Sequence, residues 1–172
     1  MQLFYQKDLH YFFRHVILNV GKNGKKWEVG DSMFIGEYRY NLDDKGRLVI
    51  PSNFKELSGS QVIIARGLEK CLYLYSMTEW EKLTSKLTAL SFTKKHNREF
   101  TRLFLSGAYE SEVDSKGRIN IDEQLLLHAN LKKECVIIGA GSRVEIWAQA
   151  EWVTYLADHQ QVIEEISEEL DL

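Results

Sequence analysis

The chain has 172 residues, enough for one ordinary domain or for two small units that share a core. Hydrophobic residues make up 44% of it and charged residues 27%, a globular composition that excludes a disordered or membrane-embedded protein, and no apolar run is long enough for a spanning helix. The net charge of −3 is unevenly spread, because residues 151–172 hold seven acidic side chains and no Lys or Arg, which leaves +4 on residues 1–150. Such a mildly basic body can offer phosphate groups a locally positive surface.

The first 32 residues combine an apolar stretch with a basic linker. The stretch LHYFFRHVILNV predicts a helix or strand that is too short and too interrupted to span a membrane. No small-residue cleavage site follows a clear apolar core, so a signal peptide is not expected. The next residues, GKNGKKWEVGDS, are typical of a flexible basic linker.

A short segment then occurs twice. LDDKGRLVI at residues 42–50 returns as VDSKGRINI at residues 113–121. When the chain is shifted by 71 residues, seven of the 17 positions of residues 34–50 are identical in residues 105–121, whereas random pairing would give about one. This similarity indicates an internal duplication.

Each copy continues with a short helix and a pair of β-like runs. The short helices are expected within residues 52–57 and 122–131, and Asp122 is placed as the N-cap of the second. The β-like runs, each broken by glycine, follow at residues 61–76 and 134–148. Their aromatic residues, Tyr73, Tyr75 and Trp147, are expected to pack across strands.

Three longer helices are predicted. The first covers residues 78–87, with Thr78 and Glu81 at capping-box spacing, the second links the copies over residues 91–104, and the third ends the chain. The apolar face of the first comprises Trp80, Leu83, Leu87 and Leu90. The apolar stripe of the third comprises Trp152, Tyr155, Leu156, His159, Ile163, Ile166 and Leu170, and its acidic face Glu164, Glu165, Glu168 and Glu169. A solvated acidic face and a partner-binding stripe are both open interpretations.

Each copy therefore follows the order β-β-α-β-β-α, which predicts a mainly β fold with flanking helices, of the α+β class. A unit of this size would expose a large share of its apolar surface if left alone. We expect the copies to bury their sheets against each other in an intertwined, pseudo-two-fold structure. The two repeated turns would then be equivalent surface loops.

The repeated turn brings together residues that can hold a cation in place. Gly46 can adopt a positive φ, and Asp43 can accept hydrogen bonds from the amides that follow it. Asp43 lies four residues before Arg47, so a hairpin can join carboxylate and guanidinium. A fixed guanidinium suits phosphate oxygens or a guanine edge, with Lys45 as a mobile charge. A plain turn with a surface ion pair would show the same residues.

The second copy favours a shared binding role over a plain turn. Lys116, Gly117 and Arg118 keep the Lys-Gly-Arg pattern, while Asp44 is replaced by Ser115 and Val49 by Asn120. Cations that persist while their neighbours change point to a common task.

The segment MFIGEYRYNLDDKGRLVIPSNFKE from Met33, the second VDSKGRINI and the spacing between them closely resemble the MraZ family of bacterial transcriptional regulators. The resemblance covers residues 33 to about 170. It implies two AbrB-like repeats of the swapped-hairpin fold that AbrB and MazE share, forming a pseudo-two-fold double-split β-barrel. The repeats would span residues 33–90 and 105–172 around the linking helix, after an N-terminal extension that is an upstream in-frame start, a cloning remnant or a genuine addition.

The resemblance also implies a function and its residues. The family forms ring-like homo-oligomers that bind direct repeats in the promoter of the division and cell-wall gene cluster, which includes the regulator's own gene, so a cytoplasmic, nucleoid-associated repressor is expected. The family's Asp-x-x-x-Arg motif occurs twice in this chain. We expect DNA contact from Arg47, Lys45, Arg118 and Lys116, with support from Asp43, Gly46, Asp114 and Gly117.

The two turns differ in their surroundings. Glu110 and Glu112 of the second copy replace Arg39 and Asn41 of the first, which makes the neighbourhood of Arg118 more acidic. The first turn is therefore the better candidate for direct DNA contact.

Other chemistry is not expected. The sequence has no nucleophile elbow, P-loop or dinucleotide fingerprint, and its five histidines lack metal-ligand spacing, so we predict no enzyme activity, cofactor, metal or small-molecule substrate. Cys71 and Cys135 are expected to be buried and reduced, which fits the cytoplasm. The basic residues of the linking helix form either a solvated face or a second phosphate-binding surface; they are Lys94, Lys95, His96, Arg98 and Arg102. The alternative function is a protein-interaction or antitoxin-like module that binds a basic partner through the acidic C-terminal helix.

Overall fold

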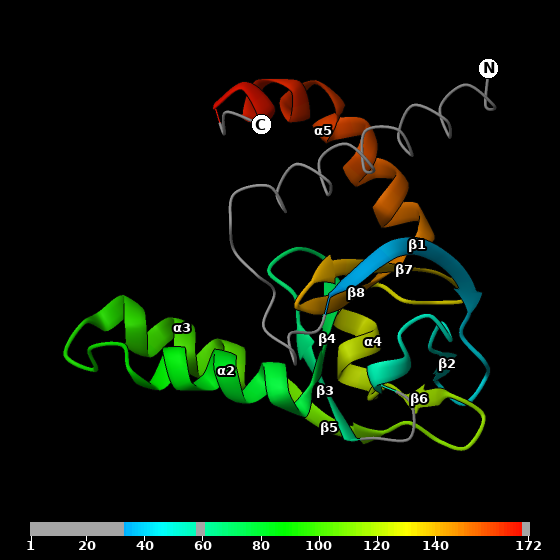
Figure 1. The fold of residues 1–172 in the computed structure, drawn as a ribbon, viewed down its shortest axis with the longest axis horizontal. Helices are drawn as coiled ribbons and strands as arrows, with labels where there is room; N and C mark the ends of the chain where they lie inside the picture. The colour runs from blue at the N-terminus through cyan, green and yellow to red at the C-terminus, as the bar shows by residue number, and fades with distance from the viewer. Residues whose placement is uncertain (1–32, 58–60, 170–172) are drawn as a thin grey trace. The chain divides into compact units, whose positions relative to one another are not determined.

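The computed structural model describes residues 33–57 and 61–169, shown in Figure 1. The predicted N-terminal extension at residues 1–32 lies outside the described residues. The first half contains β1 (Phe34–Asn41), β2 (Arg47–Val49), the 3-10 turn η1 (Lys55–Leu57), β3 (Gln61–Arg66), β4 (Cys71–Ser76) and α2 (Met77–Thr88). After α3 (Lys95–Leu105), the second half contains β5 (Ala108–Glu112), β6 (Arg118–Asn120), α4 (Glu123–His128), β7 (Glu134–Gly141), β8 (Arg143–Ala148) and α5 (Gln149–Glu169). The predicted element order and the mainly β class with flanking helices are confirmed.

The two halves exchange strands. The six-stranded antiparallel sheet has the order β1-β7-β8-β4-β3-β5, so β1 of the first half pairs with β7 of the second, and β5 of the second pairs with β3 of the first. Exchanging equivalent strands of the two halves reproduces the same order in reverse, as an internal two-fold axis between β4 and β8 requires. The intertwined, pseudo-two-fold arrangement is confirmed, whereas closure into a barrel stays a prediction.

A separate two-stranded ribbon, β2 paired with β6, lies over one face of this sheet. Between ribbon and sheet is the larger apolar core, to which β4 contributes Leu72 and Leu74 and β8 contributes Val144 and Ile146. Because side chains alternate along a strand, the residues between these point to the opposite face of the sheet.

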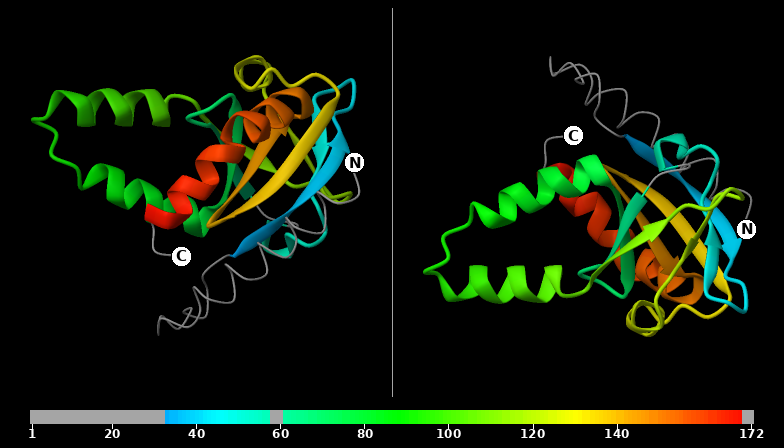
Figure 2. Two further views of the ribbon diagram at one scale, coloured as in Figure 1. Left: turned by 90° about the horizontal axis from the view of Figure 1, so that it is seen from above. Right: turned by 90° about the horizontal axis from the view of Figure 1, so that it is seen from below.

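The opposite face carries an aromatic core. Tyr73, Tyr75 and Trp147 are buried there beneath α2, α3 and the start of α5. Stacked rings of Trp80 and Phe104, 5.9 Å apart, join α2 to α3, and the two helices form an antiparallel hairpin that projects from the sheet in Figure 2. The sheet is therefore covered on both faces, and every residue of the central strand β4 is buried.

Several details differ from the sequence predictions. The capping box predicted at Thr78 and Glu81 is wrong, because α2 begins directly at the end of β4 and Ser76 is its N-cap, accepting a hydrogen bond from the Glu79 amide at 3.3 Å. Leu90 lies beyond the end of α2 and is 42% exposed. Residues 52–57 form only a 3-10 turn, and the linking helix spans Lys95–Leu105. The N-cap predicted at Asp122 is confirmed, with its carboxylate 2.8 Å from the Gln124 amide.

Residues 33–155 lie within one compact unit, and α5 continues beyond it. Within the unit, Trp152 and Tyr155 of α5 pack on Trp147, with ring centroids 5.4 and 5.0 Å away. The predicted stripe is thus anchored at its first two positions. Leu170 and the side chains of the four glutamates of the predicted acidic face lie outside the described part of the structure.

Candidate functional site

One carboxylate holds the first turn together. Asp43 Oδ1 accepts hydrogen bonds from the backbone amides of Lys45, at 2.9 Å, and Arg47, at 3.0 Å. Asp43 Oδ2 accepts a hydrogen bond from Arg47 Nε at 2.7 Å and lies 2.6 Å from Arg47 Nη2. Backbone hydrogen bonds between Asp43 and both Gly46 and Arg47 close the loop, and Gly46 has a φ of +72°, which glycine adopts without strain. The turn therefore fixes the guanidinium close to the backbone.

The second turn reproduces this geometry. Asp114 Oδ1 accepts from the amides of Lys116 and Arg118, both at 2.9 Å. Asp114 Oδ2 accepts from Arg118 Nε at 2.8 Å and from Nη2 at 2.6 Å. Gly117 has the same φ of +72° as its counterpart. Two segments 71 residues apart have thus kept both the residues and the hydrogen bonds of the motif.

The paired arginines keep both carboxylates ionised. Hydrogen bonds from the side chain and backbone of Arg47 lower the pKa of Asp43 to about 2, and Arg118 lowers the pKa of Asp114 to about 2 in the same way. The pKa of Arg47 is raised, chiefly by its hydrogen bond to Asp43, and the more distant charge of Asp114 adds to this. Each turn is therefore an intact ion pair at neutral pH.

The ion pairs leave part of each guanidinium available. A guanidinium has five N–H donors, and each arginine contacts its aspartate with Nε and Nη2. Within the described residues no other acceptor is paired with Arg47 or Arg118, whose side chains are 33% and 23% exposed. The Nη1 side of each fork can therefore meet an external acceptor in a fixed orientation.

The β2–β6 ribbon joins the two turns. Its three cross-strand pairs are Arg47–Asn120, Leu48–Ile119 and Val49–Arg118. Leu48 and Ile119 are fully buried and face the core. Because neighbouring side chains alternate between the faces of a strand, the other four share the outer face of the ribbon, and both arginines lie on it.

Each half also fastens the other half's turn. The amide of Ile121 donates to the carbonyl oxygen of Gly46 at 2.9 Å, and the amide of Ile50 donates to that of Gly117 at 2.8 Å. These reciprocal bonds fix the two turns in one rigid element. All eight predicted site residues therefore belong to a single surface built by both halves.

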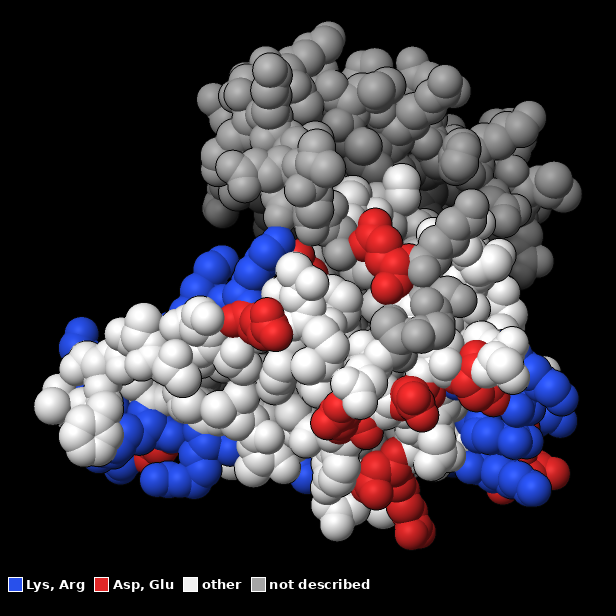
Figure 3. All heavy atoms as spheres, turned by 60° about the horizontal axis from the view of Figure 1, so that its bottom comes forward, with Lys and Arg blue, Asp and Glu red and all other residues white. Residues whose placement is uncertain are grey.

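This surface is basic. Lys45 and Lys116 are exposed and extend from the turns beside the two arginines. In Figure 3, basic side chains gather at the end of the molecule where the β1–β2 and β5–β6 turns lie, apart from a second group over the α2–α3 hairpin. Among the cations of α3, Lys95 and His96 contact Glu99 at 3.6 Å, and Arg98 donates to backbone carbonyls of residues 92 and 93. These contacts within the hairpin favour the solvated-face interpretation of the α3 cations.

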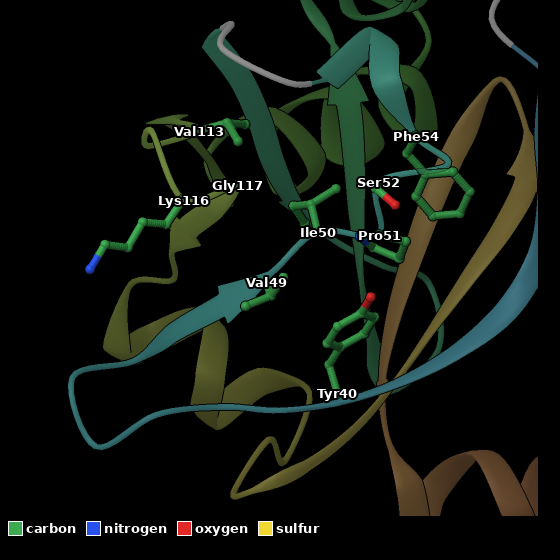
Figure 4. Close-up of a pocket in the computed structure, with 9 residues that line it drawn as sticks. All are labelled: Tyr40, Val49, Ile50, Pro51, Ser52, Phe54, Val113, Lys116 and Gly117. Carbon is green, nitrogen blue, oxygen red and sulfur yellow. The ribbon is translucent and has the colours of Figure 1, made fainter.

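A recess of about 430 Å³ lies beside the second turn (Figure 4). It is lined by Tyr40, Val49, Ile50, Pro51, Ser52, Phe54, Val113, Lys116 and Gly117. At the first turn, by contrast, Leu126 of α4 lies 3.5 Å from the position that a Cβ on Gly46 would occupy. The two turns are thus equivalent in their hydrogen bonds but not in their flanks, because a 3-10 turn follows β2 and an α-helix follows β6.

The remaining chemistry-bearing groups do not form a second site in the described part of the chain. No cluster of His, Cys, Asp and Glu there could hold a metal, and every buried side-chain polar atom has a partner. Cys71 and Cys135 are buried free thiols, as predicted, and burial raises the pKa of Cys135 to about 11. None of the described helices is long and apolar enough to cross a membrane.

Two residues of the outer face were not predicted as site residues. Val49 and Asn120 occupy equivalent positions in the two repeats, and their difference is visible in the sequence. Only the β2–β6 register shows that each lies opposite an arginine of the other half.

Comparison with known proteins places the chain among relatives. The family model described as "MraZ protein, putative antitoxin-like" matches twice, at residues 33–103 and 104–172. The transcriptional regulator MraZ of Lactobacillus delbrueckii subsp. bulgaricus is 49% identical over 139 residues, which cover 81% of this chain and 97% of the relative. The transcriptional regulator MraZ of Lactobacillus helveticus is 47% identical over the same share of both chains. These names denote a regulator, not an enzyme, in agreement with the sequence prediction.

Proposed function

This chain belongs to the MraZ family, and from that premise we propose that it is a transcriptional regulator that binds promoter DNA through its two Asp-x-Lys-Gly-Arg turns. The observation that supports this most directly is the pair of matching ion-paired turns on one outer ribbon face. A plain structural turn gains little from an exposed ion pair, whereas a held guanidinium is suited to recognition.

The β2–β6 ribbon provides the means of contact. The major groove of B-DNA is about 12 Å wide and admits a two-stranded β-ribbon. With the outer face toward the bases, Arg47 and Arg118 present their Nη1 sides to guanine O6 and N7, while Lys45 and Lys116 contact phosphates on either side. Asp43 and Asp114 orient the forks and carry no contact themselves.

The first turn makes the stronger contact in this proposal. The Arg47 side chain is 33% exposed and that of Arg118 is 23% exposed. In the second repeat, Glu110 and Glu112 are exposed on β5, the strand that precedes the turn. Like charges of DNA and glutamate repel, so Arg118 binds less strongly than Arg47.

Assembly supplies the affinity that one protomer lacks. We propose that repeats at residues 33–90 and 105–172, linked by α3, form one protomer of a ring-like homo-oligomer on the nucleoid. Several ribbons that engage direct repeats of matching spacing raise the effective concentration of each contact. The proposed target is the promoter of the division and cell-wall gene cluster that includes the protein's own gene, and the proposed effect is repression.

A fluorescence-anisotropy titration of the full chain against DNA from upstream of its own gene tests this function. Scrambled DNA of equal length and composition is the matched control, and salt is varied. We expect preference for the native repeats, a steep loss of affinity with salt at a slope of about −0.9 per phosphate contacted, and a larger loss for Arg47→Ala than for Arg118→Ala. Equal, weak binding to both DNAs that neither substitution changes would sink the proposal.

The second candidate is an interaction module, which the antitoxin-like description of the family model favours. Its binding surface would be the acidic part of α5, with Glu164, Glu165, Glu168 and Glu169. Reversing these four charges should leave a DNA-binding regulator's affinity for its repeats intact or raised, and should abolish capture of a basic protein partner by an interaction module. The two functions are therefore separable in one pair of assays.

A further inference from the structure

The two turns of the ribbon also differ in the residue that lies opposite each arginine on the outer face. Arg47 lies opposite Asn120, and Arg118 lies opposite Val49. We infer that Asn120 and Val49 determine base specificity, so that the first turn reads adenine next to a guanine and the second turn reads a thymine methyl group next to a guanine. This inference rests on the proposed DNA-binding function.

The position of Asn120 places its amide at the first turn. Asn120 belongs to the second half of the chain, yet its Oδ1 lies 4.0 Å from the position that a Cβ on Gly46 would occupy. The side chain is exposed, while its backbone carbonyl accepts a hydrogen bond from Ser111 Oγ at 3.1 Å, which fastens β6 to β5. The amide is therefore held beside Arg47 by a fixed backbone.

Val49 is placed equivalently at the second turn. It lies opposite Arg118 and lines the recess together with Lys116 and Gly117. Figure 4 shows Val49 on β2 beside the recess, with Tyr40 nearby. The side chain is half-buried, so part of its surface is open to solvent.

The chemistry of the two side chains selects different bases. An asparagine amide can donate to adenine N7 and accept from adenine N6, a pattern that no other base presents in the major groove. A valine cannot form hydrogen bonds, but it can pack on the C5 methyl group of thymine. An arginine beside either residue reads guanine O6 and N7.

A protomer with this ribbon reads an asymmetric sequence. A two-fold symmetric ribbon would present the same side chains to both strands of the DNA and would favour a palindrome, as two-fold symmetric readers do. The Val49–Asn120 difference removes that symmetry on the surface that faces the bases, while the hydrogen bonds of the turns keep it. The symmetry of the fold therefore places two arginine turns against the DNA, and the difference between Val49 and Asn120 makes the protein bind its site in one orientation.

Base analogues test the inference one atom at a time. The full chain is titrated against the promoter repeats, with each adenine replaced in turn by 7-deazaadenine, which lacks N7, and each thymine by uracil, which lacks the methyl group. The proteins are the wild type, Asn120→Ala and Val49→Ala, with Asn97→Ala on α3 and Val153→Ala on α5 as matched controls. Thermal unfolding of each variant reports whether the fold persists.

We expect one adenine at which 7-deazaadenine weakens wild-type binding about fivefold, the low end of the loss for a bidentate contact, and leaves Asn120→Ala unaffected. We expect one thymine at which uracil weakens wild-type binding about fourfold, the value of one buried carbon, and leaves Val49→Ala unaffected. The two controls should respond to both analogues as the wild type does.

Two results overturn the inference, and they are distinguishable. If the wild type binds the repeats specifically but Asn120→Ala and Val49→Ala keep every analogue response, the DNA-binding function stands and the assignment of these residues is wrong. If the wild type does not distinguish the repeats from scrambled DNA, the proposed function fails and the inference fails with it.

Discussion

Replacing Leu48 by alanine should destabilise the protein by about 3 to 4 kcal/mol. Leu48 belongs to the ribbon, and its side chain is fully buried on the ribbon's inner face, opposite Ile119, which is also fully buried. The substitution removes three carbons, worth about 2.4 kcal/mol at ~0.8 kcal/mol each. The cavity adds a further ~1 kcal/mol, because the six-stranded sheet that faces Leu48 can collapse only partly.

Urea denaturation followed by tryptophan fluorescence measures this loss as the free energy of unfolding. Val49→Ala is the matched control, because Val49 is the next residue of the same strand but lies on the outer face. It should cost about 1 kcal/mol or less. A Leu48→Ala variant that is no less stable than Val49→Ala would refute the ribbon's place on the core. The double variant with Ile119→Ala should lose less than the sum of the single losses, since the two side chains share one cavity.

Three further outcomes are expected. Gly139→Ala should lower the free energy of unfolding in urea by several kcal/mol, because the added Cβ would overlap the β1 backbone. Gly141→Ala should cost only about 1 kcal/mol, because Gly141 has open space around it but a φ of +72°. Equal losses for the two variants would contradict the β1–β7 pairing. The pKa of Asp43 and Asp114 is about 2, below the ordinary 3.8, so their contribution to stability is present above about pH 4 and lost as the pH falls toward 2. Carbon-13 NMR titration of the carboxyl groups checks this, and pKa values near 3.8 would show that the ion pairs do not form in solution. Because burial raises the pKa of Cys135 to about 11, a thiol reagent should label it slowly in the native protein and rapidly in urea, and fast native labelling would contradict its burial.

Local signals in the sequence determined the elements and the turns. The Asp-x-Lys-Gly-Arg segment contains its own hydrogen-bond donors and acceptors, so its geometry followed from the spacing of Asp43 and Arg47. The N-cap at Asp122 was predictable for the same reason. The cap of α2 was not, because Ser76 ends a buried strand and its capping role depends on where β4 stops. Sequence reasoning works where the partners of a group lie within a few residues of it.

The pairing of strands from different halves was decided only by the tertiary structure. Neither repeat forms the sheet by itself, because β1 pairs with β7 of the other half and β5 pairs with β3 of the first half. That exchange also sets the β2–β6 register, which brings Asn120 beside Arg47 and Val49 beside Arg118. The sequence by itself therefore determined that the protein has two ion-paired cationic turns. Only the fold, through contacts between residues about 70 positions apart, decided that they share one surface and which side chains accompany them.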